Sequence, residues 1–157
     1  MTRRPIKLVT LITTLALIGL TAQAVRSSPS VEGVKKPTIT VYKDPSCGCC
    51  KNWVEYLVKH GYQVDAKDTP DMPAVKRTLG VPAGLTACHT AVVNGYLIEG
   101  HVSAEDIDRL LAQKPKIAGL AVPGMPAGSP GMDGPQTQRY QVLAFDKNGK
   151  TTVFSTH

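Results

Sequence analysis

Three of the four cysteines lie within four residues of one another, at Cys47, Cys49 and Cys50. Disulfide bonds inside so short a segment close almost no loop and contribute little to fold stability. Cys47 and Cys50 form a Cys-x-x-Cys pair at the predicted start of a helix, where the helix dipole and free backbone N–H groups stabilise a thiolate. This favours both thiol–disulfide exchange and metal binding. Because the redox motif alone gives Cys49 no role, the segment favours a thiophilic metal site.

The fourth cysteine, Cys88, precedes His89 and a predicted strand over residues 90–93. Cu(I) is soft, prefers thiolate and thioether ligands, and accepts two or three of them, whereas thiolates can bridge several ions. Zn(II) takes four ligands in a tetrahedron, which Cys47, Cys50, Cys88 and His89 could supply. We predict copper in preference to zinc. The alternative interpretation of Cys88 is a buried small residue or a disulfide partner of the other cysteines.

Two methionines, Met125 and Met132, lie in a stretch over residues 113–137 that holds five prolines and five glycines. Helical core packing does not explain methionines in such a loop, and thioether ligands serve chiefly copper. We therefore predict that both assist copper binding, although they could instead hold the loop against the core. His101 fits a ligand role and a capping or surface role equally well.

The remaining sequence indicates elements that would position these residues. Hydrophobic periodicity, an Asn-Gly turn and a capping pair at Ser103 and Asp106 define most of them. The predicted strands cover residues 38–42, 62–66, 90–93, 96–99, 140–145 and 151–154, with helices after the cysteines, before Gly80 and after Ser103. The predicted fold class is α/β: a thioredoxin-like β-α-β-α-β-β-α order with a long Gly/Pro/Met loop and an added C-terminal β-hairpin. In this fold the segment before the third strand packs beside the cysteines and ordinarily carries a cis-proline, where this chain has Cys88 and His89.

The amino terminus has the layout of a secretory signal peptide. A basic start is followed by 13 residues without charge, Leu8 to Leu20, and by the cleavage sequence Ala22-Gln23-Ala24. A transmembrane helix needs about 20 apolar residues, so we expect membrane attachment only through an uncleaved signal. We predict a signal peptide over 1–24 cleaved after Ala24, a flexible lead over 25–37, and one metal-binding domain over 38–157 in the periplasm.

Composition and charge exclude several other classes of protein. With 42% hydrophobic and 19% charged residues, the chain is globular rather than disordered or collagen-like. Removal of residues 1–24 takes three basic residues and no acidic one, which lowers the formal charge from +6 to +3. Nucleic-acid binding needs a clustered basic face, and the sequence contains none.

Several separate motifs together resemble the CopG family, small exported bacterial proteins found with copper-resistance systems and long described as a domain of unknown function. The resemblance covers roughly residues 37–157 and rests on Tyr42-Lys43-Asp44-Pro45-Ser46-Cys47-Gly48-Cys49-Cys50, Cys88-His89-Thr90-Ala91, Glu99-Gly100-His101-Val102, Gly119-Leu120-Ala121-Val122-Pro123-Gly124-Met125-Pro126 and Gly128-Ser129-Pro130-Gly131-Met132. It implies a thioredoxin-like fold and a periplasmic thiolate copper site, with several copper ions in a cluster and a change in copper redox state. Carried over by position, the implied ligands are Cys47, Cys49, Cys50 and Cys88, assisted by His89, Met125 and Met132.

The sequence thus predicts a periplasmic Cu(I)-binding protein of copper resistance or homeostasis. Its partners would be copper ions and other periplasmic copper-handling proteins. The alternative is an enzyme, a thiol–disulfide or copper oxidoreductase that uses Cys47 and Cys50 as its catalytic pair. A third alternative is an accessory protein whose cysteines are structural and which docks a partner.

Overall fold

The computed structural model describes residues 35–157, which belong to one compact unit. The signal peptide predicted over 1–24 and residues 25–34 of the predicted lead lie outside this described part. Within residues 35–157, no helix has the length and apolar character needed to cross a membrane.

Helices and strands are interspersed from β1 to α3, and strands alone follow. Their bounds are β1 (Thr38–Lys43), α1 (Gly48–Lys59), β2 (Gln63–Asp68), α2 (Met72–Leu79), a 3-10 turn (Ala83–Leu85), β3 (Thr90–Val93), β4 (Tyr96–Gly100), α3 (Ala104–Gln113), β5 (Gly119–Val122), β6 (Gln141–Phe145) and β7 (Thr151–Thr156). The predicted strands and helices are all present, with ends that differ by one or two residues. Helix α2 begins after Asp71, because the Asp71 carboxylate caps it by accepting the Ala74 N–H at 2.9 Å.

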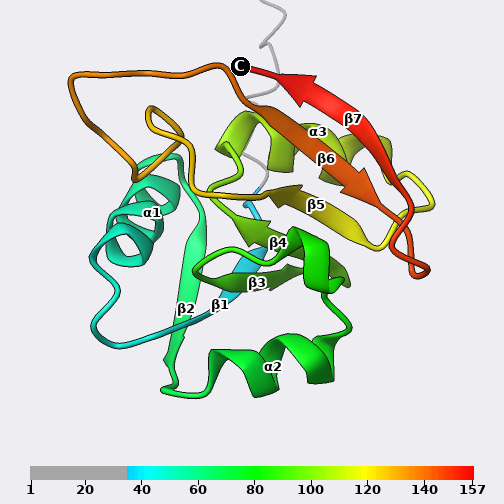
Figure 1. Ribbon diagram of the computed structural model, residues 1–157, viewed down its shortest axis with the longest axis horizontal. Coiled ribbons are helices and arrows are strands. Elements are labelled where there is room, and N and C mark those ends of the chain that lie inside the picture. Colours follow the sequence, from blue (N-terminus) through cyan, green and yellow to red (C-terminus); the bar gives the residue numbers. More distant parts are fainter. Residues whose placement is uncertain (1–34) are drawn as a thin grey trace, which may run out of the picture. The chain divides into compact units, whose positions relative to one another are not determined.

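The strands form one sheet in the order β2-β1-β3-β4-β5-β6-β7 (Figure 1). Strand β1 runs parallel to β2 and antiparallel to β3, and β3 pairs antiparallel with β4. With the helices between them, these four strands have the predicted thioredoxin-like order. The pairing of Tyr42 with Thr90 brings the end of β1, and therefore the following cysteines, next to the segment before β3.

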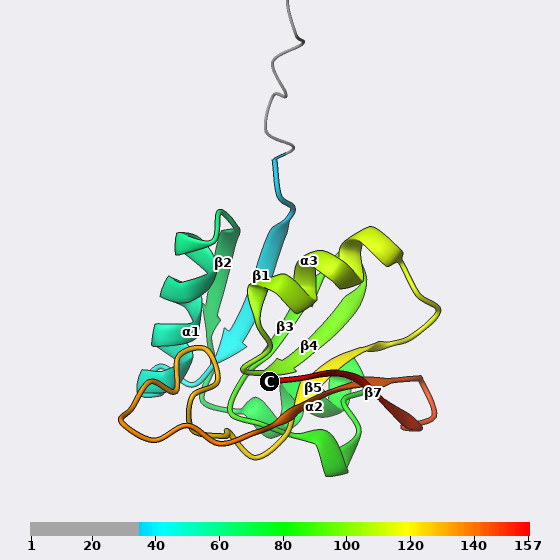
Figure 2. The ribbon, with the colours of Figure 1, turned by 90° about the horizontal axis from the view of Figure 1, so that it is seen from above.

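The two faces of the sheet carry different helices. Trp53 and Leu57 of α1 share one core with Ile107 and Leu110 of α3 and with the inward side chains of β1, β3 and β4. On β4, Ile98 belongs to this core. Because side chains alternate between the two faces along a strand, the residues directly before and after Ile98 in β4 point to the opposite face. Helix α2 covers that opposite face, so α3 and α2 lie on either side of β3 and β4 (Figures 1 and 2).

One part of the predicted loop is wrong: residues Gly119–Val122 form strand β5, parallel to β4. Leu120, Ala121 and Val122 are all fully buried, so the strand lacks the polar alternation that marks a strand with one exposed face. The prolines and glycines on either side of it are typical of a loop and therefore favoured a loop over a strand at this position. The remaining connection over residues 123–140, here the β5–β6 loop, leads to the predicted C-terminal hairpin of β6 and β7.

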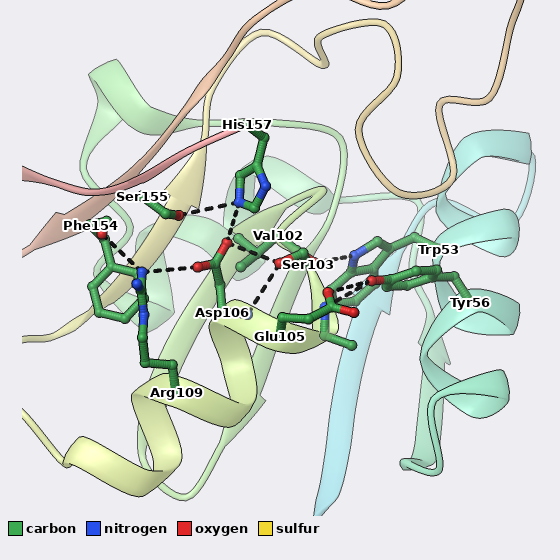
Figure 3. Close-up of polar contacts among 11 residues, drawn as sticks. Trp53, Tyr56, Val102, Ser103, Glu105, Asp106, Arg109, Phe154, Ser155 and His157 are labelled. Atoms are coloured by element: carbon green, nitrogen blue, oxygen red, sulfur yellow. Dashed lines mark hydrogen bonds and ion pairs between the residues drawn. The ribbon is translucent and has the colours of Figure 1, made fainter.

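Polar contacts hold α1, the start of α3 and the end of β7 together (Figure 3). The Trp53 indole N–H donates to the Val102 carbonyl at 2.9 Å. The buried Asp106 carboxylate pairs with His157 at 2.7 Å and with Arg109 at 3.0 Å. The Trp53 bond fixes the chain directly after His101 against α1, which carries the cysteines at its start.

Candidate metal centre

The cysteine turn (residues 47–50) forms the first turn of α1. Cys47 is the N-cap residue, and its sulfur accepts the Cys50 N–H at 3.3 Å. Cys47 and Cys50 are joined by a disulfide bond, whereas Cys49 and Cys88 are free thiols of intermediate exposure. The structure therefore pairs the two cysteines of the predicted Cys-x-x-Cys motif and leaves the additional cysteine of the turn unbonded.

Cys88 brings the fourth sulfur to this turn from the segment before β3. Its Sγ lies 3.8 Å from Cys49 Sγ, which in turn lies 3.6 Å from Cys47 Sγ. The ligand atoms of all four cysteines lie within 4.8 Å of one another. The predicted sulfur set is thus one cluster, although residue 88 is remote from the turn in sequence.

Two histidines contact the Cys88 sulfur. His89 Nδ1 lies 3.2 Å from Cys88 Sγ, and His101 Nε2 lies 3.1 Å from it. His101 Nδ1 lies 2.7 Å from the Pro130 carbonyl oxygen. Because a carbonyl only accepts, Nδ1 must donate, and neutral His101 therefore presents the lone pair of Nε2 to Cys88. A lone pair so placed suits either a metal ion or the thiol proton.

His89 is fully buried, with its ring 4.3 Å from the ring of Trp53. Its Nε2 has no hydrogen-bond partner among residues 35–157. Burial lowers the pKa of His89 well below its usual value, and the neighbouring His101 and Lys76 lower it further. The pKa of His101 is also lowered, chiefly by burial. Both imidazoles are therefore neutral near pH 7 and able to act as metal ligands.

The Cys88 thiol is protonated when no metal is bound. Its pKa is raised to about 12, chiefly by burial and also by the nearby sulfur of Cys49, while the charge of Lys76 acts in the opposite direction. A metal ion that binds this sulfur must therefore displace a proton, as is general for thiolate ligands. In the metal-free protein, the His101 Nε2 lone pair accepts a hydrogen bond from this thiol at 3.1 Å.

A buried ion pair supports the Cys88 segment from the α2 side of the sheet. Lys76 Nζ contacts the Glu99 carboxylate and donates to Thr90 Oγ1 at 2.9 Å. Glu99 also accepts the Ala87 N–H at 2.6 Å. The carboxylate is completely buried, so its hydrogen bonds offset the cost of removing it from water. The pair fixes the backbone immediately before Cys88 to β4.

Close backbone approach brings His101 to the cysteine turn. Gly100 has φ +71°, and a Cβ there would lie 2.7 Å from the Ala87 Cβ and 2.8 Å from the Val122 oxygen. Only glycine fits a left-handed conformation with so little space. The chain therefore turns sharply out of β4 and places His101 beside Cys88.

The β5–β6 loop covers the cysteine turn on its solvent side. Cys49 and Met132 line one pocket of about 470 Å³, together with Asn52. Met125 is 41% exposed and is not among the residues that line this pocket. The structure thus brings Met132 to the site and leaves the other loop methionine at the surface.

The donor set fits a soft metal ion. Four sulfurs within bonding reach of one small volume match the preference of Cu(I) for thiolate, and the two neutral imidazoles add borderline nitrogen ligands. Cys88, His89 and His101 form a second group whose ligand atoms also lie within 4.8 Å of one another. Cys47 and Cys50 offer thiolates only after their disulfide is reduced, so metal capacity depends on the redox state of the turn.

Sequence reasoning left His101 undecided and missed the pair of Lys76 with Glu99. The signal for His101 was present in the sequence Gly100-His101 directly after a strand. Its contact with Cys88 depends on how β3 and β4 pair, and no local sequence pattern predicts that pairing. The buried ion pair gave no signal, because isolated lysine and glutamate residues are typical of exposed surfaces.

Comparisons with known proteins find both a matching family and similar solved structures. A family model described as "Protein of unknown function, DUF411" matches residues 85–132. Two solved structures, both described as copper resistance protein CopG, are 42% identical to the chain and cover 78% of it and 98% of their own length. Their TM-scores are 0.74 for the structure named Form 2 and 0.73 for Form 1. No curated protein matches the chain.

Proposed function

This chain belongs to the CopG family of copper resistance proteins, and on that premise we propose that it binds Cu(I) through Cys47, Cys49, Cys50 and Cys88. The observation that carries the proposal is the position of the four sulfurs, which all lie within 4.8 Å of one another. Thiolates favour Cu(I) over harder ions and can bridge two ions through one sulfur. The chain would thus bind copper and contribute to copper resistance.

We propose more than one copper ion per chain. Cys88 belongs both to the sulfur group and to the group with His89 and His101, so its thiolate can bridge two ions. Met132 lies at the pocket of Cys49, where its thioether completes the coordination of a copper ion or passes it on. A single tetrahedral Zn(II) at Cys47, Cys50, Cys88 and His89 is the competing assignment.

We further propose that the protein works in the periplasm after cleavage of its signal peptide behind Ala24. The layout of residues 1–24 supports this assignment. In that compartment the protein would buffer Cu(I) and exchange it with other copper-handling proteins. Met125, exposed on the β5–β6 loop, is a thioether through which such a transfer would begin.

A second candidate function is a thiol–disulfide or copper oxidoreductase. The closed disulfide between Cys47 and Cys50 at the start of α1 favours it, because that position stabilises the leaving thiolate. Catalytic turnover against a disulfide or Cu(II), lost in Cys50→Ser, would establish this activity. A reaction that stops after one equivalent per protein would instead leave binding as the function.

The test of the binding proposal is an anaerobic Cu(I) titration of the reduced chain from residue 25 against a chromogenic chelator. Native mass spectrometry at each point gives the number of ions. We expect tight binding of more than one ion and a loss of at least one ion in Cys49→Ser. Full affinity and stoichiometry in that variant, or failure of the reduced protein to compete with a micromolar chelator, would contradict the proposal.

Matched variants separate the ligands from the surrounding surface. His101→Ala should lose affinity or one ion, whereas His60→Ala, at the far end of α1, should match the parent protein. Met132→Leu should weaken binding more than Met125→Leu in the purified protein, because only Met132 shares a pocket with Cys49. A Zn(II) titration in parallel decides between the metals: one tightly bound Zn(II) that Cu(I) fails to displace supports the zinc assignment.

A further inference from the structure

We infer that the end of the sheet remote from the cysteine turn is a docking surface for a membrane of anionic phospholipids. Two sets of side chains make up this surface. The basic rim consists of Lys114, Lys116, Lys147 and Lys150, and the apolar strip consists of Leu97, Leu143 and Val153. Neither set contains a residue of the metal centre, so the inference goes beyond the proposed function and does not depend on it.

Strand pairing brings the lysines of the basic rim together. Strands β5 and β6 are antiparallel, and directly before β5 the Ala118 N–H donates to the Phe145 carbonyl at 2.7 Å. The connection from α3 to β5 therefore runs beside the turn between β6 and β7, and both lie on the same side of the molecule in Figures 1 and 2. No run of basic residues in the sequence indicates this cluster, which is why membrane contact was expected only through an uncleaved signal.

The positive charge of the basic rim is not neutralised by neighbouring carboxylates. All four lysines are exposed, and the ion pairs within residues 35–157 involve other cations. Asp146 is the one acidic residue in the two connections, over residues 114–118 and 146–150. Its carboxylate accepts the N–H groups of Asn148 at 2.8 Å and of Lys150 at 3.0 Å, so it shapes the turn. Four positive charges thus face solvent beside a single negative one.

The apolar strip adjoins the basic rim on the α2 side of the sheet. Leu97 and Leu143 are half-buried and pack against a small core cluster around Phe145. Val153 pairs with Leu143 across β6 and β7, so its side chain lies on the same face, where it is 55% exposed. In Figure 1 none of the described helices covers this face of β7. Lys147 and Leu97 line one pocket of about 470 Å³, which joins the rim to the strip.

This combination fits a lipid surface better than a protein partner. The rim contains lysine and no arginine, and protein interfaces are depleted in lysine and enriched in arginine. The long stem of lysine can lie along apolar groups while its ammonium reaches a phosphate. A second copy of the chain, related by a twofold axis, would place the same positive rim against itself. Anionic leaflets instead attract clustered lysines, each of which strengthens binding about fivefold.

The position of the surface sets the orientation of a docked molecule. Strand β3 begins directly after the metal centre and ends at the turn of Asn94 and Gly95, and Gly95 lines the same pocket as Lys147. The docking surface and the metal centre therefore lie at opposite ends of β3. Figures 1 and 2 both show the start of α1 on the opposite side of the molecule from the turn between β6 and β7. A protein docked on a bilayer in this way keeps its cysteine turn open to the aqueous compartment.

The experiment measures binding of the metal-free chain from residue 25 to phospholipid vesicles by co-sedimentation. Vesicles of phosphatidylglycerol and phosphatidylethanolamine are compared with vesicles of phosphatidylcholine, which carry no net charge. We expect binding to the anionic vesicles alone at low salt. Binding should decline strongly in about 1 M salt, where charges are screened beyond about 3 Å.

Two variants with the same loss of net charge separate the site from overall charge. The rim variant is Lys114→Gln/Lys116→Gln/Lys147→Gln/Lys150→Gln, and the control variant is Lys35→Gln/Lys51→Gln/Lys59→Gln/Lys67→Gln. The rim variant should bind anionic vesicles at least about 100-fold more weakly at low salt, whereas the control variant should stay within a few fold of the parent protein. Circular dichroism confirms that each variant is folded.

A second pair of variants tests the apolar strip. Val153→Thr keeps the branched shape of the side chain and removes one apolar methyl group, so binding to anionic vesicles should weaken about fourfold. Val58→Thr is the matched control, because Val58 is equally exposed, at 54%, but lies on α1. The control should bind as the parent protein does, and an equal effect of both changes would exclude contact of the strip with lipid.

Three results would overturn the inference. The first is a parent protein that does not bind anionic vesicles at low salt, and the second is an equal loss of binding in the rim and control variants. The third is a dimer of the parent protein in sedimentation equilibrium that the rim variant fails to form, which would assign the surface to a second copy. Cu(I) uptake by the reduced rim variant is measured separately and should match the parent protein, so failure of lipid binding leaves the proposed copper binding intact.

Discussion

Replacement of Gly131 by alanine should detach the β5–β6 loop from the cysteine turn. Gly131 has φ +81°, and a Cβ at this position would lie 2.7 Å from the backbone nitrogen of Trp53 and 3.0 Å from the carbonyl oxygen of Cys49. Both atoms belong to the backbone of α1, so neither can move aside as a flexible side chain would. The loop itself must therefore shift.

Two energies add up in Gly131→Ala. The left-handed conformation costs a non-glycine residue about 1–2 kcal/mol, and overpacking against a fixed backbone costs about 1–3 kcal/mol. We expect the free energy of unfolding to fall by roughly 2–5 kcal/mol, unless the loop relieves part of the overlap by local unfolding. For a chain of this size, this corresponds to a decrease in Tm of roughly 6–15 °C.

The assay is denaturant unfolding of the disulfide form, followed by the Cu(I) titration of the reduced form. Gly134→Ala is the matched control, since a Cβ at Gly134 has no atom within 4 Å. The control should change the free energy of unfolding by less than about 0.5 kcal/mol. Cu(I) affinity should fall in Gly131→Ala alone, because Met132 moves with the loop while all four cysteines stay in place.

Equal stability of Gly131→Ala and Gly134→Ala would refute the reasoning, since it would mean that the loop does not pack on α1. A loss of stability without any loss of Cu(I) affinity would refute only the contribution of Met132. The pair of measurements therefore separates the packing of the loop from its role at the metal.

Three further changes test the packing around the site. Glu99→Ala leaves the ammonium group of Lys76 buried without its carboxylate and should cost about 3–5 kcal/mol in urea unfolding; Lys76→Met/Glu99→Leu should cost less, and an equal cost would count against the ion pair. Burial and the bond to Asp108 raise the pKa of Tyr62, so the unfolded chain ionises first and stability should decline as pH rises above about 10. Tyr62→Phe should flatten that decline in thermal unfolding, and an unchanged slope would contradict this. Asp106→Ala removes a buried carboxylate that pairs with His157 and should cost about 1–3 kcal/mol in urea unfolding. A change within about 0.5 kcal/mol would show that the Asp106 contacts drawn in Figure 3 add no stability.

Much of the fold follows from local signals in the sequence. Asn94-Gly95 gives the turn of the hairpin between β3 and β4, with both residues at positive φ as expected. Ser103 caps α3 by accepting the Asp106 N–H, as the capping pair predicted. Strand β5 escaped prediction because its side chains are buried on both faces, which leaves no period in the sequence to detect.

Only some residues of the candidate site could be predicted from the sequence. The cysteines and His89 could be singled out because their residue types are rare and their spacing is short. The place of His101 depends on the strand pairing that sets it beside Cys88, and its tautomer depends on the Pro130 carbonyl, 29 residues away. Separations of that kind are set by tertiary structure, so a single sequence gives no period or motif for them.

The sulfur pairs differ greatly in how far apart they lie along the chain, and this bears on the order of folding events. Cys47 and Cys50 are three residues apart and meet through local chain fluctuations, whereas Cys49 and Cys88 are 39 residues apart. The second pair therefore requires closure of a long loop and the pairing of β1 with β3. A newly synthesised chain that meets an oxidant early closes the local pair first. A disulfide between Cys88 and the cysteine turn in a trapped folding intermediate would thus show that β1 and β3 had already paired when the oxidant arrived.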